Sequence, residues 1–99
     1  MYGTVARLKV LPGKEEDFLN YGKSLAGLNI PGWVATATYR ADAGGGEYWL
    51  AVVFESKEAY RANADSPEQD ARYQEMRALL AADPEWNDGE VVSRITSAG

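Results

Sequence analysis

The stretch at residues 47–60, EYWLAVVFESKEAY, carries apolar side chains on both faces of an extended chain. Its even positions hold Tyr48, Leu50, Val52 and Phe54, and its odd positions hold Trp49, Ala51 and Val53. A strand with one face in water alternates apolar and polar residues. The pattern therefore predicts a strand that is covered on both faces.

Three other segments show the period-two pattern of strands. Residues 2–11 place Thr4, Ala6, Leu8 and Val10 on one face and end at Pro12-Gly13. Residues 33–41 follow Pro31-Gly32, and the glycine-rich turn at 42–46 joins them to the stretch at 47–60 as an antiparallel hairpin. Residues 86–95 are predicted to form the last strand, with an interruption near 87–89.

Helical spacing fills the segments between these strands. Residues 14–27 carry Phe18, Tyr21 and Leu25 on one stripe, and a short helix is expected from 56 to about 63. The longest helix is predicted to begin at a capping box, Ser66-Pro67-Glu68-Gln69, and to end near Pro84. The order β-α-β-β-α-β predicts an α+β, ferredoxin-like fold in one domain across residues 1–99, with a four-stranded antiparallel sheet and two main helices on one face.

The second face of such a sheet would expose apolar residues, among them Trp49, Ala51 and Val53. Too few residues follow Ile95 to fold back over it. Because an open apolar face of this size is unusual for a soluble monomer, we expect a homodimer in which two sheets pack together.

Charge and composition narrow the possible partners. The chain has 15 acidic and 10 basic residues, a net charge of −5, whereas nucleic acids and anionic lipids bind basic surfaces, so neither a nucleic acid nor a membrane is expected as a partner. The sequence contains no Cys and no His, which excludes disulfides, thiolate nucleophiles, Ser-His-Asp catalysis and histidine ligands for metal or haem. Neither a membrane span nor a signal peptide is apparent, so we expect a cytoplasmic protein without a metal site.

Three segments, LKVLPGKEEDFLNY, PGWVATATYRAD and EYWLAVVFESKEAYRANADSPEQDARY, resemble the antibiotic biosynthesis monooxygenase-like domains. The likeness runs from Val5 to about Val92. It implies a dimeric α+β barrel with a pocket between the helices and the sheet of each protomer. Its members include cofactor-free quinone-forming monooxygenases, haem degraders, and dehalogenating or decarboxylating relatives, so the resemblance implies a fold more sharply than a reaction.

The haem-degrading branch fits this chain poorly. Its pattern has an Asn in the first strand, a Trp in the short helix and a haem-ligating His in the long helix. The matching positions here hold Ala6, Asn63 and Tyr73, so all three are replaced. We therefore expect no cofactor.

The resemblance implies that Asn63 and Tyr73 border the pocket, which makes them the candidate catalytic residues. Each also has a structural interpretation, because Tyr73 lies on an apolar helical stripe and Asn63 suits the end of a helix. The candidate ligand-binding residues are the aromatic and cationic ones in or beside the central hairpin, namely Trp33, Tyr39, Arg40, Trp49 and Tyr60. Such aromatic residues clamp planar ligands, but they also build cores and dimer interfaces. Arg7 and Arg40 lie on strands, where pairing with a glutamate across the sheet competes with binding an anionic substrate.

Two classes of function remain open on these residues. The first is a cofactor-independent monooxygenase-like enzyme for a small aromatic or polyketide-type molecule, with Tyr73 and Asn63 as polar groups, Arg40 as an anion partner, and Trp33 and Trp49 as walls. The alternative is a non-catalytic dimeric domain that binds a small hydrophobic ligand or only assembles. A rearranging or decarboxylating enzyme is a third possibility.

Overall fold

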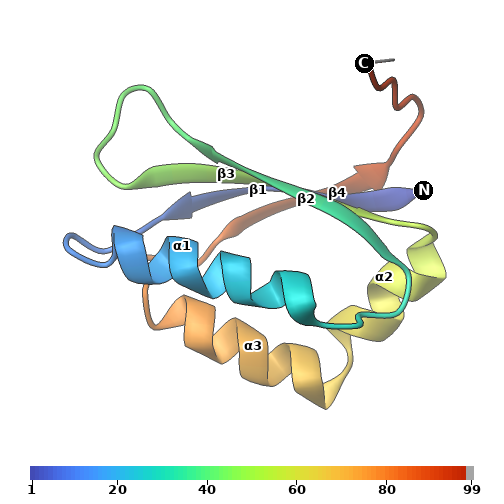
Figure 1. The fold of residues 1–99 in the computed structure, drawn as a ribbon, viewed down its shortest axis with the longest axis horizontal. Coiled ribbons are helices and arrows are strands. Elements are labelled where there is room, and N and C mark those ends of the chain that lie inside the picture. Colours follow the sequence, from blue (N-terminus) through green and yellow to red (C-terminus); the bar gives the residue numbers. More distant parts are fainter. Residues whose placement is uncertain (98–99) are drawn as a thin grey trace.

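A computed structural model describes residues 1–97 and places the helices on one face of a four-stranded antiparallel sheet (Figure 1). The strands are β1 (Tyr2–Lys9), β2 (Trp33–Arg40), β3 (Glu47–Phe54) and β4 (Glu85–Glu90), in the sheet order β2-β3-β1-β4. The helices are α1 (Glu15–Ser24), extended by the 3-10 turn η1 (Leu25–Gly27), α2 (Lys57–Ala64) and α3 (Pro67–Arg77). The predicted α+β, ferredoxin-like fold is therefore confirmed.

The two serines predicted from the sequence to start helices do cap them. The Ser56 hydroxyl accepts a hydrogen bond from the Ala59 backbone N–H at 3.0 Å, and Ser66 accepts one from the Gln69 N–H at 3.1 Å. The reciprocal bond of a capping box is absent from α3 because the Gln69 side chain accepts a hydrogen bond from Arg72 instead. Gln69 is thereby held toward the interior and takes part in the site described below.

The predicted ends of two elements are wrong. The longest helix stops at Arg77 and not near Pro84, because the chain after it pairs with the end of β1: the Leu11 N–H donates to the Leu79 carbonyl at 2.9 Å, and the Ala81 N–H to the Lys9 carbonyl at 2.8 Å. The last strand is also shorter than predicted. It ends at Glu90 and runs without interruption through 87–89, where it pairs with β1.

The core lies between the helices and the even-numbered face of the sheet. Its cluster of buried side chains comprises Leu8, Val10, Phe18, Tyr48, Met76 and Leu80. The register explains this, because antiparallel pairing sets Leu8 opposite Tyr48 and Ala6 opposite Leu50, so even positions share one face. The even half of the double-sided apolar pattern in β3 is thus covered by the helices of the same chain.

The odd-numbered face of the sheet points away from the helices. On it Val5, Tyr39 and Trp49 are 56%, 57% and 40% exposed, and within residues 1–97 no helix covers them (Figure 1). Arg7 lies on the same face and pairs with Glu47 at 2.6 Å. This is the cross-sheet glutamate pairing that was one of the two interpretations of Arg7.

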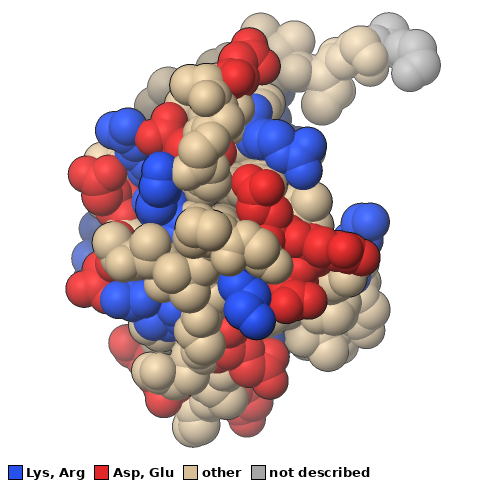
Figure 2. Space-filling view, turned by 90° about the vertical axis from the view of Figure 1, so that its left-hand side faces the viewer, with Lys and Arg blue, Asp and Glu red and all other residues tan. Residues whose placement is uncertain are grey.

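Charged side chains of both signs lie intermixed on the side of the molecule in Figure 2, without a continuous basic surface there. Among the described residues, no helix combines the length and the apolar character that crossing a bilayer requires.

Candidate functional site

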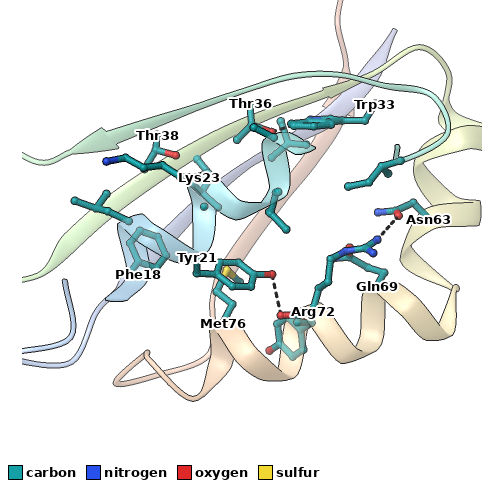
Figure 3. A pocket seen from close by; sticks show the side chains of 18 of the residues that line it. Phe18, Tyr21, Lys23, Trp33, Thr36, Thr38, Asn63, Gln69, Arg72 and Met76 are labelled. Atoms are coloured by element: carbon teal, nitrogen blue, oxygen red, sulfur yellow. Dashed lines mark hydrogen bonds between the residues drawn. The ribbon is translucent and has the colours of Figure 1, made fainter. Parts of the chain in front are cut away.

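A cavity of about 410 Å³ opens between α1 with η1, α3, and the even-numbered face of β2 and β3 (Figure 3). Most of its wall is apolar, formed by residues that include Phe18, Leu25, Ile30, Leu50, Val52 and Met76. A volume of about 410 Å³ and a largely apolar wall fall within the range of small-molecule sites in proteins.

An irregularity in β2 brings Trp33 into this cavity. Trp33 pairs with Phe54 and Ala35 pairs with Val53, so the register shifts between positions 33 and 35. Such a bulge turns the side chain of an odd-numbered residue to the even-numbered face. The indole N–H of Trp33 then donates to the Thr36 hydroxyl at 2.9 Å, which fixes the ring along the cavity wall (Figure 3).

The polar end of the cavity is a small network around Arg72. The Arg72 guanidinium donates to the Asn63 side-chain oxygen and to the Gln69 side-chain oxygen, both at 3.2 Å. These bonds join the end of α2 to the first half of α3. Figure 3 shows that the amide nitrogen of Asn63 is left on the cavity side, because Arg72 takes the amide oxygen.

Tyr21 ties α1 to the same network from the other side. Its hydroxyl donates to the Arg72 backbone carbonyl at 2.8 Å, although the two residues are far apart in the chain. Burial raises the pKa of Tyr21, and the nearby Glu75 carboxylate raises it further. The hydroxyl therefore stays protonated at neutral pH and continues to hold the two helices together.

The charged side chains that line the cavity are all of one sign. Lys23 and Arg72 are its charged lining residues, and no Asp or Glu lines it among residues 1–97. A second hollow of about 520 Å³ adjoins it, shares Ile30, Asn63 and Arg72 with it, and carries Glu55 and Glu68. The Arg72–Asn63 pair thus forms the partition between the two spaces.

The structure separates the seven candidate residues from the sequence into two groups. Trp33, Asn63 and Tyr73 line the cavity, and Tyr73 also packs beside the Trp86 ring, with 6.4 Å between ring centroids. Tyr39 and Trp49 lie on the odd-numbered face of the sheet, away from the cavity. Arg40 and Tyr60 are also not among the residues that line it.

The Arg40 side chain is hydrogen-bonded to the buried residue Tyr48. Its Nε donates to the Tyr48 hydroxyl at 3.0 Å, and Tyr48 in turn donates to the Glu15 carboxylate at 3.1 Å. Tyr48 is almost fully buried, so this chain of bonds satisfies its hydroxyl. Arg40 therefore has a structural partner, and its predicted role as an anion partner has no support from its position.

Tyr60 lies on α2 and forms a hydrogen bond with a residue of β4. Its hydroxyl donates to the Asp88 carboxylate at 2.8 Å. Burial and this bond to Asp88 raise the pKa of Tyr60 to about 12. The folded chain therefore keeps a proton that the unfolded chain loses near pH 10, so the stabilisation is complete below pH 10 and is lost as the pH rises toward 12.

A Tyr60→Phe variant is therefore expected to lose stability less steeply than the native chain between pH 10 and 12. Urea unfolding followed by circular dichroism at several pH values measures this slope. Identical slopes for the native chain and Tyr60→Phe would contradict the assignment.

Sequence reasoning missed Arg72, Lys23 and Gln69 as cavity residues. A signal for two of them exists on α3, because Gln69, Arg72 and Met76 are spaced i, i+3 and i+7 and so share one helical face. Polar residues on the side of a helix that faces the protein interior indicate that a cavity lies there. Lys23 gives no such signal, because a lysine in the last turn of a helix is ordinarily a surface residue.

Comparison with known proteins places these features in a family. A model of the antibiotic biosynthesis monooxygenase family matches residues 1–75. No protein of curated function matches the chain in sequence.

Several solved structures share the fold. A crystal structure of a proposed antibiotic biosynthesis monooxygenase from Caulobacter crescentus superposes with a TM-score of 0.80 at 25% identity, over 93% of this chain and 90% of that one. SnoaB from Streptomyces nogalater, a cofactor-independent oxygenase solved as a mutant, gives a TM-score of 0.80 at 18% identity, over 97% of each chain. A conserved protein from Methanosarcina mazei gives 0.76 at 19% identity, over 89% of each chain. At 18% and 19% identity these last two likenesses establish the fold alone.

Proposed function

Because the chain belongs to the antibiotic biosynthesis monooxygenase family, we propose that it is a cofactor-independent monooxygenase acting on a small aromatic molecule held in the cavity between its helices and its sheet. The observation that carries the proposal is the combination of an apolar cavity with an oriented amide donor on Asn63. That combination provides what such a reaction needs from a protein, which is exclusion of water and stabilisation of an anion.

The proposed reaction uses dioxygen directly. An electron-rich substrate such as an anthrone or a hydroquinone-like phenol ionises to a carbanion or phenolate equivalent, which transfers electrons to dioxygen. For an anthrone-type ring, the methylene carbon becomes a carbonyl by gaining one oxygen atom, and its two hydrogens leave in one water molecule that contains the second oxygen atom. Dioxygen is the oxidant and accepts four electrons, so no further reductant is needed.

Asn63 would stabilise the anion. Its side-chain oxygen is engaged by Arg72, so its NH₂ group is presented to the cavity as a donor (Figure 3). A preorganised donor aimed at developing negative charge makes a large contribution to lowering the activation barrier. Tyr73 also lines the cavity and would supply a second hydroxyl contact to the substrate.

Among the described residues, neither a carboxylate nor a histidine lines the cavity to act as a general base. Nearby positive charge favours the ionised form of an acidic substrate, and Lys23 and Arg72 supply that charge. In the proposed mechanism the substrate therefore ionises on entry, and its proton passes to water at the mouth of the cavity.

Replacing Asn63 by alanine is expected to lower kcat for anthrone oxidation by about 100-fold, with a smaller change in KM, because the lost donor acts mainly on the anion. Oxygen uptake with anthrone, measured with an oxygen electrode, tests this. Asn20→Ala, at an exposed position on α1, is the matched control and should retain full activity. Uptake that Asn63→Ala and Tyr73→Phe both leave unchanged would remove the proposed roles.

The same cavity also supports the alternative of a binding domain without catalysis. The two functions differ in one measurement, because a binding domain would bind the aromatic molecule and leave oxygen uptake at the rate of the buffer. Calorimetric binding together with uptake at background would establish the alternative.

A further inference from the structure

The charge of the cavity is opposite to the charge of the protein. The chain has 15 acidic and 10 basic residues, yet among residues 1–97 the charged side chains that line the cavity are Lys23 and Arg72. An apolar wall around two cations focuses positive potential into the space between them. A ligand that is anionic before it enters gains binding energy from this potential, whereas a neutral ligand gains from it only once it has ionised.

Arg72 is half-buried and has no acidic partner among the described residues. Its bonds go to two neutral amide oxygens, those of Asn63 and Gln69. By contrast Arg7 and Arg77 pair with carboxylates at 2.6 Å and 2.8 Å. A guanidinium has five N–H donors, so Arg72 retains donors for a further acceptor. A partly buried guanidinium that pairs with no carboxylate is available to an anionic ligand.

The two cations lie on opposite sides of the cavity. Figure 3 shows Lys23 and Arg72 toward opposite ends of the cavity, with Arg72 beside Asn63. Lys23 is exposed and lies at the rim, where it attracts an anion without holding it. Arg72 is held in place by its two amide partners, and a fixed guanidinium binds a carboxylate through two parallel hydrogen bonds.

From these observations we propose that the cavity selects aromatic carboxylic acids whose phenolic hydroxyl is adjacent to the carboxylate. The carboxylate binds Arg72, and the flat ring lies along Trp33 and the apolar wall. The adjacent hydroxyl then meets the NH₂ group of Asn63, because Asn63 and Arg72 are themselves hydrogen-bonded neighbours. This inference rests on the proposed function in using the same cavity, and it specifies the substrate class.

Calorimetric titration of the whole chain with 1-hydroxy-2-naphthoate and with 1-hydroxy-2-naphthamide tests the inference. The two ligands have the same rings and hydroxyl and differ in charge. The acid is expected to bind at least about tenfold more tightly than the amide, because hydrogen bonds to charged groups exceed neutral ones by that margin. This readout does not depend on turnover.

Variants assign the effect to Arg72. Arg72→Gln should weaken binding of the acid about 10- to 100-fold and change binding of the amide by less than about threefold. Arg72→Lys should restore part of the affinity for the acid, because it keeps the charge and loses the two-pronged geometry. Arg61→Gln, an exposed position on α2 outside the cavity, removes the same charge and should leave both affinities unchanged.

Equal affinities of the native chain for acid and amide would overturn the inference and leave the proposed oxygenation intact. Failure of both ligands to bind would overturn the inference and also remove the cavity from the proposed function. If circular dichroism shows that Arg72→Gln does not fold, the Lys23→Gln variant at the exposed rim of the cavity tests the inference instead. This variant should bind the acid about two- to fivefold more weakly at low salt and bind the amide as the native chain does. An equal loss of affinity for the amide would count against the inference.

Discussion

Replacing Gly3 by alanine is expected to lower the free energy of unfolding by about 3 kcal/mol, the upper part of the range for overpacked sites. A Cβ at this position would collide with the backbone carbonyl oxygen of Val52 on the neighbouring strand β3. A backbone atom in a central ladder cannot rotate away as a side chain does, so β1 and β3 would have to separate. Because β1 also pairs with β4, the disturbance reaches both of its neighbours. Urea unfolding at constant pH measures the loss.

Gly89 is the matched control, since it is the register partner of Gly3 on the other side of β1. An added Cβ there meets nothing within 4 Å. Gly89→Ala is therefore expected to change stability by less than about 0.5 kcal/mol. A loss of similar size in both variants would show that the cost comes from strand conformation in general and not from the close approach of β1 to β3.

The second large effect concerns the odd-numbered face of the sheet. We propose that a second copy of the chain covers this face, sheet against sheet, in a two-fold dimer. Support comes from the exposure of Val5, Tyr39 and Trp49 on a face that no helix within residues 1–97 covers. The native chain is then expected to have about twice its 10.8 kDa mass in light scattering, and Trp49→Glu should reduce it to the mass of one chain. A carboxylate buried without a partner at the centre of the interface is the cause.

Trp49→Glu is expected to leave the protomer folded, because Trp49 is 40% exposed within it. Ala71→Glu, at an exposed position on α3, adds the same charge on the opposite side of the molecule and should remain a dimer. A native mass near that of one chain at micromolar concentration would contradict the proposal.

Most of the fold was predictable because the helices and strands have strong local signals. The strand starting at Trp33 follows a Pro-Gly pair, and the helix starting at Pro67 follows a capping serine. The errors fall where long-range pairing overrides local pattern. The backbone after Arg77 leaves the helix and forms hydrogen bonds with the backbone of Lys9 and Leu11. The local sequence after Arg77 does not predict these partners.

The site was predictable only in part, for a similar reason. The sequence identified Trp33, Asn63 and Tyr73, which line the cavity, but it also grouped Tyr39 and Trp49 with them. One register shift in β2 separates Trp33 from Tyr39, because it turns Trp33 to the helical side while Tyr39 stays on the opposite face. A bulge of one residue has no reliable signature in a single sequence. Arg72 was missed because its importance comes from the lack of a salt bridge to a carboxylate, which is a property of the folded chain.

The position of β2 at the edge of the sheet has a consequence for how this protein can diverge. Its backbone is bonded to one neighbour, β3, while the central pairing of β1 with β3 and β4 is independent of it. The strand that carries Trp33, Thr36 and Thr38 can therefore tilt or change its bulge and reshape one wall of the cavity, while the framework that holds the chain together stays as it is. Substitutions in this peripheral strand can therefore alter the cavity wall at a lower cost in stability than substitutions in the central strands.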